Sequence, residues 1–359
     1  MSAVYAVIMA GGGGTRLWPL STPERPKPFL PLFPGEARDQ TLFQKTIARI
    51  LGPDLDLDDI TVVASSAYAE LARGQVPGVR ILEEPQGRNT AAAIALAAVA
   101  IDRPDDDVMI VLPADHLIVA EDIFRGVLLS AATGLATGSF GIPDPLVTLG
   151  IQVDRPATEY GYLLPDLGRG ADVGGLQAYP LRAFEEKPDP ARAAELGRTP
   201  GVAWNAGMFL WRRGAILAAF RDFAPDVYDP IAEGWAGGRL AEGYATARAV
   251  SIDYAVMEPA AAAQRVVMAS MEVGWSDLGS WTVLLAALDG VGVGRVVQPG
   301  DTAEAGPDDL VVERVHGRLV RTDGPRGILA RTPVARLAGA RPARDIVVQL
   351  LDRAARQEA

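Results

Sequence analysis

The chain opens with an apolar run that ends in four consecutive glycines. Residues 4–9 read Val-Tyr-Ala-Val-Ile-Met, and Ala10 then leads into Gly11, Gly12, Gly13 and Gly14. A continuous apolar run of this length predicts a strand buried on both faces, as in a parallel sheet covered by helices. Glycines directly after a strand allow backbone N–H groups to approach phosphate oxygens closely. The beginning of the chain therefore predicts an α/β fold with an anion-binding loop.

Later segments repeat this alternation of strand and helix. Residues 60–64 and 108–112 are apolar runs that predict buried strands, and residues 89–101 have high helix propensity, with Asn89 or Thr90 able to cap the first turn. Such alternation predicts a largely parallel sheet covered on both faces, with the active site beyond the carboxyl ends of its strands. The remaining expectations are a strand over 147–151, helices over 190–196 and 214–223, and a loop over 133–145.

The pattern of apolar and turn-forming residues changes after about Asp289. Short apolar pieces such as 310–312 and 318–320 alternate there with Gly, Pro and Asp, which is typical of short strands and turns. A last helix is expected over 343–356. We therefore predict a large domain over residues 1–290 and a small β-rich domain over residues 291–359 that ends in this helix.

Composition excludes several classes of protein. The 359 residues are 49% hydrophobic, carry a formal net charge of −11 and include no cysteine. Disulfides, thiolate catalysis and cysteine metal sites are excluded. The negative charge argues against nucleic acid and anionic membranes as partners. No apolar run approaches the ~20 residues that span a bilayer, and no targeting segment is visible, so we expect a cytoplasmic protein.

The glycine loop does not fit the two commonest nucleotide-binding patterns. The sixth position from Gly11 is Arg16, so the dinucleotide pattern G-x-G-x-x-G fails, and the P-loop ending Gly-Lys-Ser/Thr is absent. What remains is a glycine loop with Arg16, followed by Lys27. Two cations near an anion-binding loop suit a triphosphate. The loop alone leaves open a glycine-rich turn with solvated cations.

Motifs along the chain resemble those of the sugar-nucleotide pyrophosphorylases, and among them the mannose-1-phosphate guanylyltransferase branch. They occur in the order of that family, from the start of the chain to about Trp281. They are 9–31, which contains Trp-Pro-Leu-Ser and Lys-Pro-Phe-Leu; Glu84-Pro85 with Arg-Asn-Thr-Ala at 88–91; Leu-Pro-Ala-Asp-His at 112–116; Tyr-Gly-Tyr at 160–162; Phe-Glu-Glu-Lys-Pro at 184–188; Trp-Asn-Ala-Gly-Met-Phe at 204–209; Ser-Ile-Asp-Tyr at 251–254; and Gly-Trp-Ser-Asp-Leu-Gly-Ser-Trp at 274–281.

The resemblance implies a Rossmann-like nucleotidyltransferase domain with a mostly parallel mixed sheet. It implies transfer of GMP from GTP to mannose 1-phosphate, which yields GDP-mannose and pyrophosphate. The sugar phosphate is already an anion near neutral pH, since its second pKa is ~6, so no general base is needed. Positioning, charge neutralisation and a Mg²⁺ ion that bridges phosphates would carry the reaction.

The same resemblance assigns residues to roles. Asp115 and Asp277 would bind the metal. Arg16, Lys27, Asp115, Lys187 and Asp277 form the expected catalytic set. The expected nucleotide-binding residues are Gly11, Gly12, Gly13, Gly14, Thr15, Arg16, Lys27, Glu84, Pro85, Asn89 and Thr90. The expected sugar phosphate-binding residues are Gly161, Glu186, Lys187, Asn205 and Asp253.

Each of these residues also has a structural reading. Asp115 and Asp277 could be turn residues, Asn205 a turn residue before Gly207, and Asp253 a helix N-cap. His116 is expected to make a structural hydrogen bond, and Trp275 and Trp281 to be wall or core residues.

Three alternatives remain at the level of function. The first is the same chemistry with another pair of substrates, such as glucose 1-phosphate and dTTP. The second is a non-catalytic sugar-nucleotide sensor, and the third is a nicotinamide dehydrogenase, against which the failed dinucleotide pattern argues. GTP and mannose 1-phosphate are the expected partners, and a homodimer is left open.

Overall fold

A computed structural model describes residues 2–12, 17, 21–32, 40–279, 283, 284 and 287, together with short strand segments between 295 and 338. The chain divides into two compact units. The first unit comprises Met1–Gly11, Ile47–Ala114 and Ile118–Trp275, and the second comprises Gly12–Thr46, Asp115–Leu117 and Ser276–Ala359. The expected border between residues 290 and 291 lies outside the described residues and stays a prediction.

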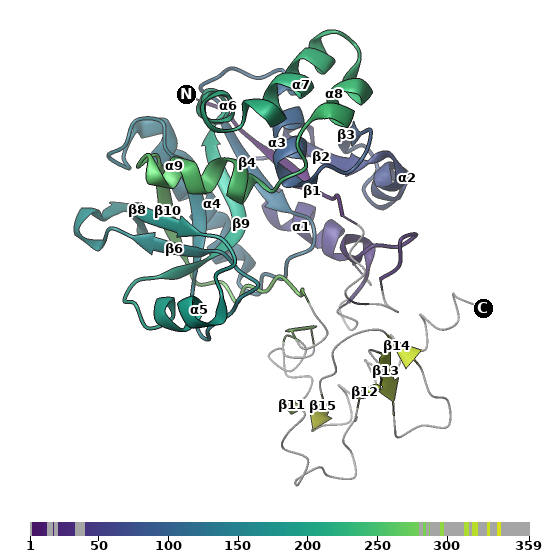
Figure 1. Cartoon of the computed structure of the whole chain (residues 1–359). Coiled ribbons are helices and arrows are strands. Elements are labelled where there is room, and N and C mark those ends of the chain that lie inside the picture. Colours follow the sequence, from purple (N-terminus) through teal and green to yellow (C-terminus); the bar gives the residue numbers. More distant parts are fainter. Residues whose placement is uncertain are drawn as a thin grey trace. The chain divides into compact units, whose positions relative to one another are not determined.

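A mixed ten-stranded sheet organises the first unit (Figure 1). Its order is β3-β2-β1-β4-β9-β5-β10-β8-β6, with β7 paired to β8. The strands are β1 Val4–Met9, β2 Ile60–Ser65, β3 Arg80–Glu84, β4 Val108–Pro113, β5 Leu146–Gln152, β6 Tyr162–Pro165, β7 Ala171–Val173, β8 Leu176–Glu185, β9 Ala203–Arg212 and β10 Val266–Met271.

The apolar runs identified in the sequence form the parallel part of this sheet. β1 pairs in parallel with β2 on one side and β4 on the other, and β2 pairs in parallel with β3. β5 and β10 are also parallel, whereas the pairs that involve β9, β6 and β8–β10 are antiparallel. Residues 5–8 of β1 are buried because both faces of the strand are covered. The predicted α/β class with a mixed sheet is confirmed. The sheet is not mostly parallel as expected, because β9, β8 and β6 add antiparallel pairs beside the parallel strands.

Helices cover the two faces of the sheet. α3 (Asn89–Ala100) is buried over residues 91–98 because it packs between β1 and β3 on one side and α6 and α7 on the other. Val7, Met109 and Trp211 belong to the same core cluster as α3. Alternate residues such as Ile110 face the opposite way, toward α4. The helices are α1 Leu42–Ile50, α2 Ser66–Gln75, α4 Glu121–Thr137, α5 Pro190–Leu196, α6 Arg213–Phe223, α7 Pro225–Ala236, α8 Leu240–Thr246 and α9 Glu258–Ala262.

The loop expected over residues 133–145 is wrong in its first part, because α4 continues to Thr137. Gly134 does not break the helix. A Cβ at this position would lie 2.5 Å from the ring of Phe140, so the glycine leaves room for that ring to pack. α4 ends where Gly138 adopts a left-handed conformation, with φ 69°. The helix therefore ends at the glycine whose backbone is free to turn.

The described residues of the second unit form short elements. Lys27–Phe29 is a single 3-10 turn, and Phe29 packs edge-on against Phe43 of α1. Toward the C-terminus, β11 (Arg295–Val297) pairs with β15 (Arg336–Ala338), and β12 (Val312–Val315), β13 (Arg318–Arg321) and β14 (Leu329–Ala330) form a second small sheet. These strands agree with the predicted β-rich tail. The helix expected over 343–356 lies outside the described residues.

Candidate functional site

The order of the parallel strands reverses at β1. Because β1 lies between β2 and β4, the connections that leave β1 and β4 diverge at their carboxyl ends, which is where ligands bind in open α/β sheets. Gly11 and Gly12 follow β1 and are exposed, and Gly12 has φ 108°. Gly13, Gly14, Thr15 and Arg16 lie outside the described residues. The predicted phosphate loop therefore begins at the expected edge of the sheet.

Lys27 joins two segments of the second unit that are far apart in the sequence. Its Nζ lies 2.8 Å from Asp115 Oδ2 and donates a hydrogen bond to the backbone carbonyl of Asp277. Leu117 and Ser276 form a β-bridge beside these residues, which holds the two segments together. The Lys27 side chain is only 8% exposed, so its charge is withdrawn from water and paired with a carboxylate. Three residues of the expected catalytic set thus form one cluster.

Asp277 lies in a tight turn. Its Oδ1 accepts the Gly279 N–H at 3.1 Å, and Leu278 has φ 45°. A Cβ at Gly279 would overlap Asp277 Oδ2, so the glycine gives the carboxylate room. The turn reading raised from the sequence therefore holds for one oxygen of Asp277. His116 Nε2 lies 3.9 Å from Asp115 Oδ1, beyond hydrogen-bond distance, so this pair is not the structural hydrogen bond expected for His116.

Glu84 ends β3 and is buried beside Gly11. Glu84 is only 5% exposed, and a Cβ at Gly11 would lie 3.2 Å from Glu84 Oε2. The fully buried Tyr244 of α8 donates its hydroxyl toward Glu84 Oε1 at 3.4 Å and toward the Ala92 carbonyl at 3.1 Å. Desolvation raises the pKa of Glu84 to about 7, partly offset by the Tyr244 hydrogen bond.

The other expected nucleoside residues lie at the beginning of α3. Pro85 and Asn89 are exposed, and Asn89 has φ 67°. Asn89 Oδ1 accepts the Thr90 N–H at 2.8 Å, and Thr90 Oγ1 accepts the Ile252 N–H at 2.9 Å. The predicted N-cap is wrong: the cap position is Arg88, which makes no side-chain cap bond. Thr90 instead connects α3 to the Ser251–Tyr254 segment.

Glu186 and Lys187 follow β8 and form an ion pair, with Lys187 Nζ 2.5 Å from Glu186 Oε1. The Glu186 side chain is buried, whereas the Lys187 side chain is half-exposed. Desolvation opposes the charge of Lys187, but the hydrogen bond and charge of Glu186 outweigh it and raise the pKa of Lys187. A Cβ at Gly161 would overlap Glu186 Oε2, so the glycine leaves room for this carboxylate.

Asn205 connects this pair to Asp253. Asn205 Nδ2 donates to Asp253 Oδ1 at 2.8 Å, and the Asn205 N–H donates to the Gly161 carbonyl at 2.8 Å. The N-cap reading of Asp253 is wrong, because its segment is a π-helical turn capped at Ile252 and its carboxylate receives the Asn205 amide. Desolvation and the negative charge of Glu186 raise the pKa of Asp253 well above its usual range. All five expected sugar phosphate residues therefore form one cluster in the first unit.

Several residues of these clusters carried no clear signal in the sequence. Tyr244 supports Glu84, Thr148 donates to Asn205 Oδ1 at 2.7 Å, and Glu258 accepts the Glu186 N–H at 2.8 Å. Only Thr148 could have been noticed in the sequence, because its hydroxyl interrupts an apolar strand.

The two tryptophans of the last motif differ in what the structure says of them. Trp275 packs edge-on against the ring of Tyr160, with 5.5 Å between the ring centroids, as expected for a wall residue. Trp281 lies outside the described residues.

Backbone strain marks the same regions. Five described non-glycine residues have positive φ, and three of them, Asn89, Lys187 and Leu278, are expected site residues or follow one directly. Such strained residues gather at functional sites because the surrounding structure must hold them.

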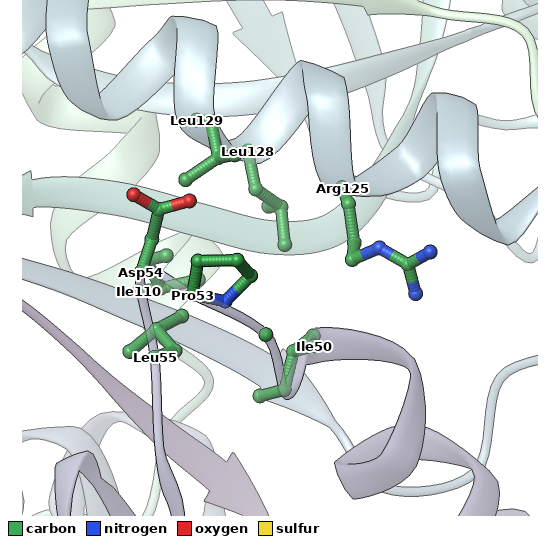
Figure 2. A pocket seen from close by; sticks show the side chains of 9 residues that line it. Ile50, Pro53, Asp54, Leu55, Ile110, Arg125, Leu128 and Leu129 are labelled. Carbon is green, nitrogen blue, oxygen red and sulfur yellow. The ribbon is translucent and has the colours of Figure 1, made fainter.

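A small, largely apolar hollow of about 100 Å³ lies elsewhere, between β4, α4 and the segment after α1 (Figure 2). None of the expected site residues lines it. Arg125 at this hollow donates to the Arg49 carbonyl at 3.1 Å and pairs with Asp122. Its lining includes Ile50, Pro53, Leu55, Ile110, Leu128 and Leu129.

The sequence is similar to known proteins over most of its length. The sequence profile of a family described as nucleotidyl transferase matches residues 5–291. The xanthan biosynthesis protein XanB of Xanthomonas campestris is 38% identical over 82% of this chain and 62% of its own length. The mannose-1-phosphate guanylyltransferase of Escherichia coli is 37% identical over 79% of this chain and 59% of its own length. The chain thus spans about three fifths of these curated relatives.

A solved structure from Thermus thermophilus resembles the whole chain. That protein is described as a mannose-1-phosphate geranyltransferase, and it matches with a TM-score of 0.69 and 29% identity over 99% of both chains. No helix in the described part of the chain is long and apolar enough to cross a membrane.

Proposed function

Because this chain belongs to the nucleotidyl transferase family, we propose that it transfers GMP from GTP to mannose 1-phosphate. The observation that carries this proposal is the similarity to relatives named mannose-1-phosphate guanylyltransferase, at 36% identity over 90% of this chain in Sinorhizobium fredii and 37% over 79% in E. coli. The clusters of charged residues described above would supply the groups that such a reaction needs.

The reaction forms one phosphorus–oxygen bond and breaks another. A phosphate oxygen of mannose 1-phosphate attacks the α-phosphorus of GTP, and pyrophosphate leaves with the electrons of the bond between the α-phosphorus and the bridging oxygen. The attacking oxygen is already anionic, since the second pKa of a phosphate monoester is ~6. The protein therefore needs to offset negative charge and align the substrates rather than remove a proton.

The Lys27 cluster is suited to the triphosphate. Lys27 carries a buried positive charge, and Arg16 with the loop amides of Gly11–Thr15 would add further donors. When triphosphate binds, Lys27 would exchange its contact with Asp115 for phosphate oxygens. Glu84, Pro85, Asn89 and Thr90, beside the beginning of α3, would frame the nucleoside.

The donors present fit a Mg²⁺ ion held mainly by its substrates. Asp115 offers a carboxylate oxygen beside Lys27, and Asp277, whose backbone carbonyl accepts from the same lysine, carries the second carboxylate of the proposed site. Mg²⁺ in phosphoryl-transfer sites takes one or two protein carboxylates plus phosphate oxygens. Among the residues that the structure describes, no group of three or more acidic or histidine side chains gathers as a self-sufficient metal site. Bound there, the ion would neutralise phosphate charge as a Lewis acid.

The cluster of Gly161, Glu186, Lys187, Asn205 and Asp253 is suited to a sugar phosphate. Lys187 would pair with the phosphate, and the carboxylates of Glu186 and Asp253 with the amide of Asn205 would accept and donate hydrogen bonds to hydroxyls. Gly161 would contribute by leaving room for the Glu186 carboxylate. Use of GTP and of Mg²⁺ in particular, a homodimer and a cytoplasmic location are part of this proposal.

A pyrophosphate-release assay tests the function directly. Each of GTP, ATP, UTP and dTTP is combined with mannose 1-phosphate and with glucose 1-phosphate, with Mg²⁺ present or chelated. We expect GTP with mannose 1-phosphate to give the highest kcat/KM and chelation to abolish turnover. Higher kcat/KM for dTTP with glucose 1-phosphate would favour the alternative substrates, and binding without pyrophosphate release in any combination would favour a sensor.

A further inference from the structure

A hydroxyl lies in the middle of an otherwise apolar strand of the sheet. Thr148 is in the middle of β5 between Val147 and Leu149, and all three residues are fully buried. Valine has the same shape as threonine without the polar atom, so packing of this strand does not require a hydroxyl. A buried hydroxyl costs free energy unless it is hydrogen-bonded. The partner of the hydroxyl therefore explains the choice of threonine.

That partner is the side-chain amide of Asn205. Thr148 Oγ1 donates to Asn205 Oδ1 at 2.7 Å, while its distance to the Met208 carbonyl is 3.5 Å, at the limit of a hydrogen bond. The Gly207 N–H also donates to Asn205 Oδ1, at 3.2 Å. With two donors on its oxygen, the amide turns its Nδ2 toward Asp253 Oδ1, 2.8 Å away.

An irregularity in the sheet brings these groups together. In the pairing of β5 with β9, Thr148 lies opposite Phe209 and Gly150 lies opposite Asn205, so the segment between Asn205 and Phe209 is longer than its partner. Gly207, with φ 64°, lies within this extra length. The bulge directs the Gly207 N–H to the Asn205 oxygen, and Thr148 supplies the second donor from the neighbouring strand.

The opposite orientation of the Asn205 amide is unfavourable. It would place the amide NH₂ against the Gly207 N–H, and it would place the amide oxygen against a carboxylate oxygen of Asp253. The Thr148 hydroxyl holds the same amide oxygen in place from the fully buried side of Asn205. Nδ2 carries two N–H donors. One donates to Asp253 Oδ1, and in this orientation the other would be available to a ligand.

We infer that Thr148 is a positioning residue for sugar phosphate binding, acting through the Asn205 amide and the Asp253 carboxylate. This inference rests on the proposed function, in which Asn205 and Asp253 contact the sugar phosphate. Thr148 itself does not touch a substrate. Loss of its hydroxyl removes one of the two hydrogen bonds that hold the amide oxygen in place, and so weakens the contacts of one substrate only.

The test compares Thr148→Val with the wild-type chain by kinetics and by calorimetric titration with mannose 1-phosphate alone. We expect the variant to bind mannose 1-phosphate about tenfold more weakly, as for loss of one hydrogen bond in a buried network, with an unchanged KM for GTP. Thr61→Val is the matched control, since Thr61 is another buried threonine of the same sheet, in β2; it should behave like the wild type. Equal weakening for both substrates, or none, overturns the inference.

A second pair of variants separates the hydroxyl from packing. Thr148→Ser and Thr148→Ala differ only in the hydroxyl, so serine should retain mannose 1-phosphate binding and alanine should lose it even where both lower the thermal midpoint. In an Asn205→Ala background the difference between threonine and valine at position 148 should vanish, because the route through the amide is gone. A difference that persists there contradicts the inference.

The two hypotheses fail in different ways. Mannose 1-phosphate that binds the wild type without pyrophosphate release would refute the proposed function. The affinity measured by titration would then still test the role of Thr148. An affinity and a KM for mannose 1-phosphate that are unchanged in Thr148→Val would refute the role of Thr148 and leave the proposed function intact. A wild-type chain that does not bind mannose 1-phosphate would overturn both.

Discussion

At the scale of single residues, three residues expected to act in catalysis already contact one another. Lys27 pairs with Asp115 and with the backbone of Asp277. Because the lysine charge offsets an aspartate in the free chain, substrates and metal in the proposed reaction would have to rearrange this pair. The three residues are therefore expected to respond to substitution in different ways.

Substitution of Asp277 by Asn should lower kcat at least about a hundredfold, because weakening a metal site that offsets several kcal/mol of charge repulsion raises the barrier accordingly. The exposed Asp54, which lies at the apolar hollow, provides a control as Asp54→Asn. Turnover would be measured across a range of Mg²⁺ concentrations. Near-normal activity of the Asp277 variant in limiting Mg²⁺ would refute its role.

The chain has three lysines, Lys27, Lys45 and Lys187, which allows a comparison in one series. Lys27→Ala should raise the KM for GTP, and Lys187→Ala should raise the KM for mannose 1-phosphate, with a loss in kcat wherever the lysine also meets transition-state charge. Lys45→Ala in α1 serves as the control. If Lys187→Ala impairs GTP binding and spares mannose 1-phosphate, the two roles are assigned wrongly.

Glu84 predicts a pH dependence of stability. Its pKa is raised from 4.5 to about 7 in the folded chain by burial, so its neutral form favours folding. This contribution is complete below pH 4.5 and is lost as the pH rises through 7. The loss corresponds to about 3 kcal/mol at most. Between about pH 5 and 8, Glu84→Gln should therefore become more stable relative to the wild type in denaturant titrations. A constant difference across this range would contradict the shift.

At the scale of elements, α8 matters because it holds Tyr244 beside Glu84. α8 packs closely on α7: a Cβ at Gly243 would overlap the Pro230 carbonyl oxygen, and Gly234 Cα lies only 3.4 Å from that position. Backbone atoms cannot move aside as a flexible side chain can. The closeness of the two helices thus depends on glycine at position 243.

Gly243→Ala should destabilise the chain by about 1–3 kcal/mol, the usual cost of overpacking, and should also weaken nucleotide binding through displacement of Tyr244. Gly126→Ala in α4 is the matched control, because a Cβ there meets nothing within 4 Å. This control should be neutral or stabilising by up to about 1 kcal/mol. Denaturant unfolding and GTP titration measure the two effects. Equal stability of both variants would contradict the argument.

At the scale of the whole molecule, the described strands of the tail are short, from two to four residues. Sheets of this size are not stable alone and need a surface to cover. The family profile ends at residue 291, and none of the expected site residues lies beyond it. We therefore expect the tail to support the protein without contributing to the reaction.

Deletion of residues 291–359 should lower solubility, the thermal midpoint or the oligomer size before it alters substrate preference. Light scattering, thermal unfolding and the pyrophosphate-release assay measure these properties on the same preparation. A truncated chain that keeps its fold and assembly state but loses all turnover would place a catalytic group in the tail.

Local patterns in the sequence determined the elements of this protein. The apolar run 4–9 and the alanine-rich segment 89–101 became β1 and α3 almost to the residue, because continuous burial leaves a strong local signature. The motifs singled out Asp115, Lys187 and Asn205 as expected site residues. Where a local signal was ambiguous, as at Gly134, the outcome depended on Phe140, a contact that only the folded chain makes.

Only the tertiary structure decided which side chains meet. The Lys27–Asp115 pair, the support of Glu84 by Tyr244 and the hydrogen bond from Thr148 to Asn205 join residues that are far apart in the sequence. No periodicity or propensity encodes such pairs, since they arise from strand order, from the bulge in β9 and from the packing of α8 on α7. The physical reason is that propensity acts over a few residues, whereas hydrogen bonding and desolvation depend on every atom that folding brings near.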